Sequence, residues 1–226
     1  MFLVKLTPLP TFIESNLITN RTRLWQIHFF SYSCNMDQPL TENHDFKNKD
    51  YTTSNLFKTE YTDCTFTNCN FENSDLSNIS FLECDFLDCN FSNANVMHTS
   101  FNDVTFKGCK ILGVIFQSCN PFLLSFKFID CTLNFSSFYQ LKISKTNFLK
   151  CTMHQVDFTE AEAKYVVFKD CDLLGATFDR TNIEYSDFTS AFNFNINPAL
   201  NKIKSASFSK ENIYGLLESF HIKIIE

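Results

Sequence analysis

The chain has 226 residues, a formal net charge of −6 and an unusual excess of phenylalanine, with 28 Phe against one Trp and four Gly. The acidic balance argues against direct binding of nucleic acid, because that binding relies on basic side chains. So many phenylalanines exceed what one globular core requires and favour a repeated unit with one ring in each repeat.

Residues 1–35 differ from the rest of the chain because they show no regular repeat. Their apolar start is interrupted by a lysine and two prolines, too early for a secretory signal or a membrane span. We therefore expect a cytoplasmic protein that makes no membrane contact. Because Met36 lies close to the first repeat, residues 1–43 form either a loosely packed N-terminal extension or an upstream stretch that precedes the true start codon.

A bulky apolar residue recurs at every fifth position in the first half of the chain. These residues, which we call repeat centres, are Tyr61, Phe66, Phe71, Leu76, Phe81, Phe86, Phe91, Val96, Phe101, Phe106, Ile111 and Phe116. A small or short residue mostly stands two positions before each centre. Weaker repeats at residues 44–58 are typical of a terminal coil. A period of five fits neither a helix nor a strand, but it fits a solenoid in which five residues form one side of a coil.

The register of the repeat shifts once, because Phe116 and the next centre, Phe128, are twelve residues apart. The second run of centres is Phe128, Leu133, Phe138, Ile143, Phe148, Met153, Phe158, Ala163, Phe168, Leu173, Phe178, Ile183 and Phe188. Pro121 cannot donate a ladder hydrogen bond, so we expect a bulge or short loop at residues 120–125. We also expect two stacks of rings. They are Phe66, Phe86 and Phe106, and then Phe128, Phe148, Phe168 and Phe188.

Nine of the ten cysteines occupy the small position of a repeat, and only Cys34 does not. Residues twenty apart should stack on successive coils, which predicts one ladder of three thiols and two ladders of two. These ladders are Cys131/Cys151/Cys171, Cys64/Cys84 and Cys69/Cys89. The repeat dictates these positions, so buried reduced thiols are favoured over disulfides. No Cys or His spacing fits a zinc site, and we expect no metal or cofactor.

Catalysis finds no support in the sequence. The five histidines are scattered, and no Ser-His-Asp order, glycine-rich phosphate loop or pair of carboxylates can be identified. A solenoid filled with side chains also offers no cleft for a small substrate. We therefore expect a protein that is not an enzyme.

After Phe188 the period of five stops, and residues 193–226 show signals of helices. Asn197-Pro198 suits the start of one helix, and Ser209 suits the cap of a second. The second helix would carry a narrow apolar stripe, too apolar to face water in a monomer. This candidate dimer interface is Ile213, Leu216, Leu217 and Phe220.

Charge is distributed unevenly, because no Lys or Arg lies between Lys58 and Lys107. The acidic residues of that stretch form a candidate partner-binding face: Glu60, Asp63, Glu72, Asp75, Glu83, Asp85, Asp88 and Asp103. An acidic surface repels nucleic acid and attracts proteins that bind nucleic acid. The alternative is that these carboxylates only keep the protein soluble. The second half of the chain carries many lysines, so any such mimicry of DNA is uneven.

The repeat, in the form Cys-x-Phe-x-x, resembles the pentapeptide-repeat family. That resemblance implies an all-β solenoid, a right-handed quadrilateral β-helix with four pentapeptides in each coil, over residues 44–192. A C-terminal helical cap and dimerisation segment would follow at residues 193–226. Stability should then be nearly additive along the axis, because each coil contacts only its neighbours.

The C-terminal block NFNINPALNKIKSASFSKENIYGLLESFHIKII resembles the gyrase-protecting branch of the family, which includes the microcin B immunity protein and the Qnr-type quinolone-resistance proteins. The resemblance implies a homodimer, formed through the C-terminal helix, that mimics DNA. It also implies binding to bacterial DNA gyrase or another type II topoisomerase and protection against a toxin or a quinolone. Many Qnr proteins carry two projecting loops, whereas this chain has one short interruption. The alternative function is a generic protein-interaction rod with an unknown partner.

Overall fold

The computed structural model describes residues 40–223 and 225. The expectations for residues 1–35 and for Met36 lie outside the described residues. The strands are short and are β1 (Leu40–Glu42), β2 (Asp45–Lys47), β3 (Glu60–Thr62), β4 (Thr65–Thr67), β5 (Ser80–Leu82), β6 (Asp85–Leu87), β7 (Ser100–Asn102), β8 (Val104–Lys107), β9 (Phe126–Ile129), β10 (Asn147–Leu149) and β11 (Val167–Lys169). The 3-10 turns are η1 (Phe116–Ser118), η2 (Ile213–Leu216) and η3 (Glu218–Phe220).

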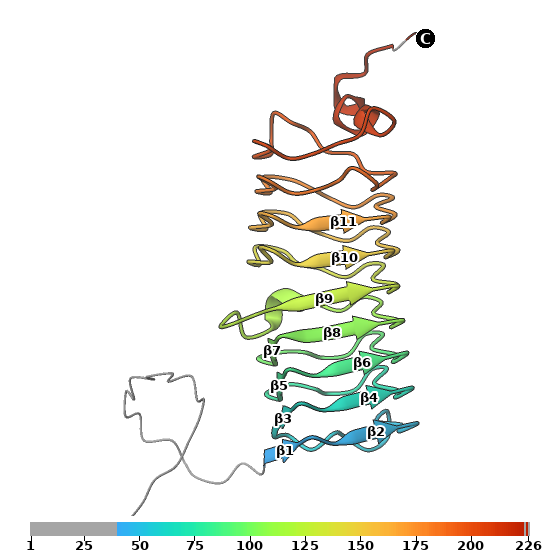
Figure 1. The fold of residues 1–226 in the computed structure, drawn as a ribbon, viewed down its shortest axis with the longest axis vertical. Helices are drawn as coiled ribbons and strands as arrows, with labels where there is room; N and C mark the ends of the chain where they lie inside the picture. The colour runs from blue at the N-terminus through green and yellow to red at the C-terminus, as the bar shows by residue number, and fades with distance from the viewer. Residues whose placement is uncertain (1–39, 224, 226) are drawn as a thin grey trace, which may run out of the picture. The chain divides into compact units, whose positions relative to one another are not determined.

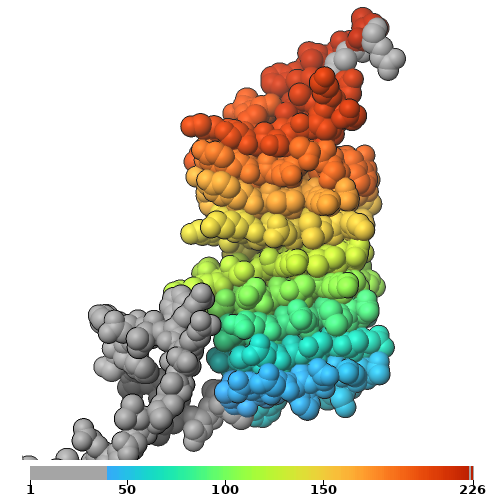
Figure 2. All heavy atoms as spheres, viewed as in Figure 1, coloured from blue at the N-terminus to red at the C-terminus, as the bar shows by residue number. Residues whose placement is uncertain are grey.

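The strands form two parallel sheets that run along the solenoid. One has the order β1-β3-β5-β7, and the other has the order β2-β4-β6-β8-β9-β10-β11 (Figure 1). Most paired residues are twenty apart, as Phe66 and Phe86 are. Four repeats of five therefore make one coil, which confirms the predicted all-β solenoid. The coils form successive bands in Figure 2.

Single-residue bridges continue the ladder on the other sides of the coil. Asn70 bridges to Asn90 on one side, and Asp75 bridges to Asn95 on another. The last bridge joins Asp187 to Ser207. The coiled region thus starts at β1, before residue 44, and extends past residue 192.

The repeat centres fill the interior of the solenoid with aromatic rings. Along the seven-stranded sheet each ring stacks on the next, with centroids 4.5–5.2 Å apart. The column contains Phe46, Phe66, Phe86, Phe106, Phe128, Phe148, Phe168, Phe188 and Phe208. Both predicted stacks are present, but they are not separate, because Phe106 stacks on Phe128. Phe106 pairs with Phe128 in register, so the extra residues lie outside the coil.

The extra residues form a loop at 121–125, before β9 (Figure 1), as the sequence predicted. Phe122 and Leu123 are 73% and 61% exposed at this loop. Leu123 stands where a repeat centre would, but it points away from the interior. Phe126 is buried instead, with its ring 5.5 Å from that of Phe101 and 5.2 Å from that of Phe116. The ring of Phe126, together with the partly buried Leu124, therefore fills the interior at this coil.

The described cysteines are buried and free. The two-residue shift at the loop joins two of the predicted thiol ladders through Cys109. The resulting ladder is Cys69, Cys89, Cys109, Cys131, Cys151 and Cys171. Most of these thiols donate to carbonyl oxygens of the preceding coil, as Cys109 Sγ does to Phe86 O at 3.3 Å. The thiols thus bond to the backbone while they fill the small inward position.

The predicted C-terminal α-helices are absent from residues 193–223, where the structure has only turns and the 3-10 segments η2 and η3. Tertiary bonds compete with helix formation here. Asn212 Nδ2 donates to Phe188 O at 2.6 Å and to Ala191 O at 2.9 Å, and Ile196 N donates to Gly215 O at 2.9 Å. A Cβ atom on Gly215 would clash with the carbonyl oxygen of Phe194. Short helices depend on such packing, and here the packing favours turns.

Within the described residues, no helix has the length and apolar character needed to cross a membrane.

Candidate protein-interaction surfaces

The residue two positions after most repeat centres has a defined orientation, because the chain turns a corner there. Residues at this corner position have positive φ, for example 51° at Asp63, 53° at Glu83 and 52° at Asp103. The backbone N–H at the corner donates to the next coil, as Asp63 N does to Leu82 O at 3.1 Å. The corner side chain therefore points outward, and equivalent corners align along the axis.

The side of the solenoid that carries the loop also carries two groups of polar and charged side chains. We call it the loop side, and it consists of residues 40–43, 59–63, 79–83, 99–103, 121–125, 141–145, 161–165, 181–185 and 201–205. The loop is attached at both ends to the preceding coil. Asn120 N donates to Thr99 O at 2.9 Å, and Ser125 N donates to Phe101 O at 3.0 Å.

The structure brings only some of the predicted acidic residues together. Asp63, Glu83 and Asp103 share one corner of the loop side on three successive coils, and we call them the acidic edge. Glu60 begins β3 on the loop side, and Asp85 begins β6 just past the corner. Asp88, Glu72 and Asp75 lie on other parts of the coil. The predicted acidic face is therefore one concentrated edge and a set of scattered carboxylates.

Two of the scattered carboxylates are half-buried and bonded to neighbours. Lys58 Nζ lies 2.7 Å from Asp75 Oδ2, and Ser77 N also donates to this carboxylate. The bond from Lys58, with help from Ser77, lowers the pKa of Asp75 to about 2. Glu72 accepts a bond from Asn90 Nδ2 at 3.1 Å. Within residues 40–223 no ion pair involves the acidic edge, whose side chains are exposed.

Beyond the loop, the same corner carries different residues. Lys145, Tyr165 and Tyr185 follow on successive coils with φ of 68°, 59° and 61°, and we call them the tyrosine–lysine edge. The two tyrosine rings stack with centroids 4.9 Å apart and remain about half exposed. Other lysines of the loop side surround this edge. They are Lys142, Lys164, Lys202 and Lys204.

Among the lysines of the loop side, only Lys164 forms ion pairs within the described region. Its Nζ lies 2.9 Å from Glu184 and 3.6 Å from Glu162. The sequence showed that basic residues return in the second half, but it did not place them. Counting by twenty, with the two-residue shift at the loop included, would have placed Lys145 in line with Asp103.

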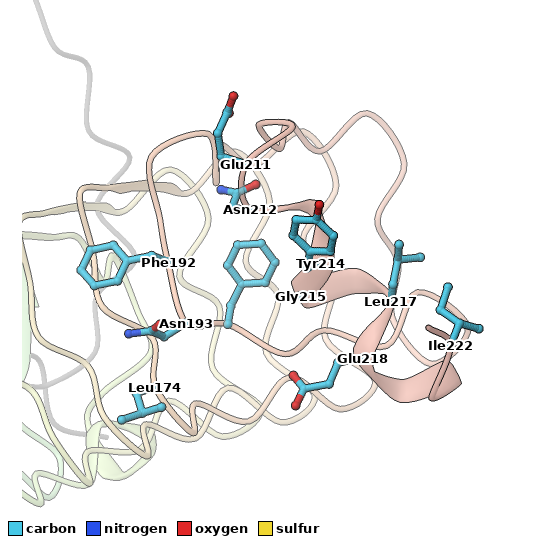
Figure 3. A pocket seen from close by; sticks show the side chains of 11 residues that line it. Leu174, Phe192, Asn193, Glu211, Asn212, Tyr214, Gly215, Leu217, Glu218 and Ile222 are labelled. Atoms are coloured by element: carbon cyan, nitrogen blue, oxygen red, sulfur yellow. The ribbon is translucent and has the colours of Figure 1, made fainter. Parts of the chain in front are cut away.

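The predicted dimer residues do not share one exposed stripe. Leu216 is 9% exposed and belongs to the core of its own chain, whereas Ile213 and Phe220 are 43% and 52% exposed. Leu217 lines a cavity of about 620 Å³ beside the turns, together with Phe192 and others (Figure 3). The remaining lining residues are Leu174, Asn193, Phe194, Glu211, Asn212, Tyr214, Gly215, Glu218 and Ile222. The C-terminal end thus presents apolar groups, although not on a helix.

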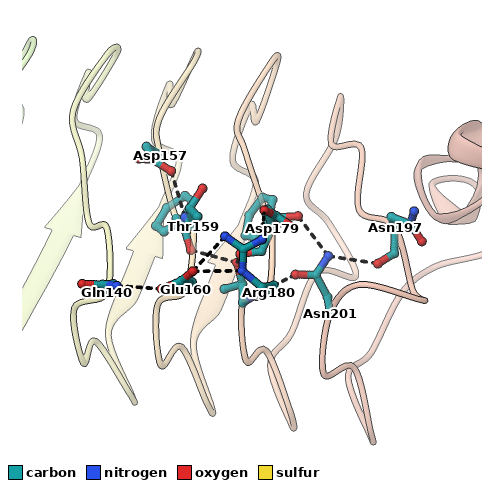
Figure 4. A network of polar contacts seen from close by, with 11 residues as sticks. Gln140, Asp157, Thr159, Glu160, Asp179, Arg180, Asn197 and Asn201 are labelled. Carbon is teal, nitrogen blue, oxygen red and sulfur yellow. Dashed lines mark hydrogen bonds and ion pairs between the residues drawn. The ribbon is translucent and has the colours of Figure 1, made fainter.

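A polar network on another side of the second half is fully engaged within the solenoid (Figure 4). Arg180 contacts Glu160 at 2.8 Å and Asp179 at 2.9 Å, and Gln140 Nε2 donates to Glu160 at 2.7 Å. These groups bind one another across coils, so they are less available to a partner. In the part of the chain that the structure describes, no group of His, Cys, Asp and Glu is placed to hold a metal ion.

The family described as pentapeptide repeat region matches residues 59–121 and 113–188, which together span more than half of the chain. The chain belongs to the pentapeptide-repeat family. No curated protein sequence matches it.

Two solved structures match this chain over most of its length. A trypsin-treated form of QnrB1, a plasmid-mediated fluoroquinolone resistance protein, is similar with a TM-score of 0.58 and 17% identity, over 83% of this chain and 92% of that one. HetL from Nostoc sp. strain PCC 7120, a pentapeptide repeat protein involved in heterocyst differentiation regulation, has a TM-score of 0.42 and 12% identity, over 77% of this chain and 88% of that one. At such identities the likeness to QnrB1 supports the solenoid fold alone.

Proposed function

We propose that this pentapeptide-repeat protein mimics DNA, binds bacterial DNA gyrase or another type II topoisomerase in the cytoplasm, and protects it from a toxin or a quinolone. The observation that carries the proposal is the acidic edge. Its carboxylates at Asp63, Glu83 and Asp103 are exposed, free of ion pairs in the described structure, and repeated once per coil. A parallel ladder has a rise of about 4.8 Å, so the edge presents one carboxylate about every 4.8 Å, compared with about 3.4 Å per nucleotide in one strand of DNA.

The length of the solenoid also suits this role. The nine coils marked by the column from Phe46 to Phe208 span roughly 38 Å at about 4.8 Å per coil, and two solenoids joined end to end span roughly 77 Å, a little over twenty base pairs. We propose that the joint is a homodimer through the C-terminal turns. The exposed parts of Ile213, Leu217 and Phe220 would form it, with the cavity beside Leu217 receiving apolar groups of the second copy. Leu216 supports these residues from the core instead.

A protein that acts in this way needs no catalytic group and no cofactor. Its binding would use the basic DNA-contacting surface of the enzyme, so the affinity should fall with added salt. The carboxylates at Glu60, Glu72, Asp75, Asp85 and Asp88 would extend the contact around the solenoid. Asp75 contributes least, because Lys58 already neutralises it.

A second candidate is a generic protein-interaction rod with an unknown partner. The observation that favours it is the change of sign along the loop side, where Lys142 and Lys145 follow the acidic edge. A DNA mimic with uniform charge would not need these lysines. The likeness to QnrB1 concerns the fold, so it does not decide between the two functions.

The experiment that separates them is a binding titration against purified gyrase with two matched variants. Glu83→Lys/Asp103→Lys reverses two charges of the acidic edge, and Asp130→Lys/Asp170→Lys makes the same change at another corner, where the residues also have positive φ. Lysine is tolerated at this kind of corner, since Lys145 and Lys150 occupy it. We expect the first variant to lose binding and the second to keep it. Equal binding by both variants would reject the acidic edge as the contact.

A further inference from the structure

The two edges of the loop side are arranged symmetrically about the loop. Before the loop, Asp103 lies one coil away, Glu83 two coils and Asp63 three coils. After the loop, Lys145 lies one coil away, Tyr165 two coils and Tyr185 three coils. All six occupy the same corner position, with positive φ. Each carboxylate therefore has a counterpart of opposite charge or a hydroxyl donor at the same distance on the other side of the loop.

We propose that the loop side is a self-complementary interface, through which two copies of this chain associate side by side and antiparallel. A two-fold axis that crosses the loop at right angles to the solenoid axis exchanges the two halves of the loop side. Such an interface is isologous, so every contact occurs twice. The occupant is a second copy because the charges at this corner complement one another under this rotation.

The rotation brings specific groups together. Asp103 of one copy faces Lys145 of the other, with Lys142 on the same coil. Glu83 faces Tyr165, beside Lys164, and Asp63 faces Tyr185. A phenol hydroxyl can donate to a carboxylate, so the acidic edge meets a charged donor and two neutral donors. Just outside these seven coils, Glu42 and Lys204 occupy matching positions four coils from the loop.

The loop supplies an apolar contact at the centre of this arrangement. Phe122 and Leu123 are 73% and 61% exposed, and no other part of the described loop side exposes two adjacent large apolar residues. Under the two-fold rotation the loops of both copies meet near the axis, so these side chains can cover one another. A small apolar centre with a polar rim is typical of protein interfaces.

The interface is small, which sets its expected strength. Seven coils at about 4.8 Å and five residues at about 3.3 Å give a strip of roughly 500 Å² on each copy. That area lies near the lower limit for specific association, so we expect a weak and concentration-dependent dimer that salt disrupts. This inference goes beyond the proposed function and does not depend on it. The lateral dimer would cover the acidic edge, so it would compete with any partner that binds there.

The test uses complementary charge variants of the full chain. Both carry Leu217→Asp, which removes the proposed C-terminal contact. The acid variant adds Glu83→Lys/Asp103→Lys, and the lysine variant adds Lys142→Glu/Lys145→Glu. Each variant alone should repel itself and sediment as a monomer at low salt. An equimolar mixture should restore complementarity on both halves of the interface, because the reversed residues face each other on one half and the unchanged residues face each other on the other half. The mixture should sediment with twice the monomer mass, and the Leu217→Asp parent should dimerise alone.

The outcomes of this test are distinct. A mixture that stays monomeric, or single variants that dimerise as strongly as the parent, would overturn the proposal. Dimerisation of the single variants would indicate that apolar contact at the loop, without the charges, joins the copies. Thermal melting of each variant checks that it is folded. Lys142→Glu/Lys145→Glu without the Leu217 substitution also separates this inference from the proposed function, because this variant should lose lateral association while it still binds gyrase.

Discussion

Phe106 and Phe128 stack face to face across the register break, with ring centroids 5.2 Å apart and an interplanar angle of 9°. They are 22 residues apart, yet they pair in the ladder as residues twenty apart do elsewhere. The two extra residues are taken up in the loop at 121–125. The break therefore leaves the aromatic column continuous and adds a feature to one side of the solenoid.

Replacing Phe86 by Ala should cost about 3–5 kcal/mol of unfolding free energy, because it removes a fully buried ring and leaves a cavity. Phe86 is 0% exposed and stacks on both Phe66 and Phe106. Urea unfolding measures the change. Phe57→Ala is the control, since Phe57 is 64% exposed and its loss should change stability by under about 0.5 kcal/mol. Similar costs for the two variants would contradict the register.

The buried thiols should resist alkylation in the native protein. Burial raises the pKa of the Cys84 thiol to about 12, and it raises the pKa of Cys119 as well. At pH 8 the thiolate fraction of Cys84 is then about one in ten thousand. A thiol-reactive dye should label the nine described cysteines only after denaturant is added. Rapid labelling of several of them without denaturant would show that the solenoid opens readily. Cys34 lies outside the described residues.

The pKa of Asp75 should rise when its partner is removed. Lys58 lowers this pKa from 3.8 to about 2, so the pair stabilises the folded state above about pH 4 and the effect disappears as the pH falls toward 2. Lys58→Met should bring the pKa of Asp75 back toward 3.8, as followed by NMR titration of the carboxyl group. Lys107→Met is the control. A pKa near 2 in the Lys58 variant would assign the shift to Ser77 instead.

The C-terminal turns give a pair of adjacent residues with opposite roles. At high salt, which disrupts the lateral association, Leu217→Asp should convert the proposed C-terminal homodimer to monomers while the melting temperature stays nearly the same. Leu216→Asp should instead lower the melting temperature, because Leu216 is 9% exposed and a charge there would be buried. Sedimentation measures the loss of the dimer, and thermal melting measures the loss of stability. An unchanged mass for the Leu217 variant would mean that the turns only cap their own solenoid.

The sequence predicts the solenoid and its inward residues well, because the period of five alone decides which side chains are buried. It predicts the loop from Pro121 and the shift of register. It does not predict the single aromatic column or the six-thiol ladder, since both depend on how the ladder resumes after the loop. The burial of Phe126 is not predicted either, because its ring stands at a position where other repeats have a small residue.

The C-terminal region shows a different limit of sequence reasoning. The stripe from Ile213 to Phe220 has helical spacing, but long-range bonds decide its conformation. Asn212 bonds to backbone atoms of the preceding coil, and Gly215 lies against Phe194. Sequence reasoning has the same limit at the acidic edge. Exposure of the carboxylates follows from their place in the repeat, whereas their grouping into one edge follows from the four-sided coil.

We propose that the protein protects gyrase by occupying its DNA-binding surface. The most direct test titrates the purified protein against gyrase and measures DNA supercoiling together with toxin- or quinolone-induced DNA cleavage. We expect that the wild-type protein reduces the induced cleavage, that added salt weakens the effect, and that Glu83→Lys/Asp103→Lys abolishes it while Asp130→Lys/Asp170→Lys does not. Induced cleavage and supercoiling that stay unchanged at every concentration of the wild-type protein would contradict the claim.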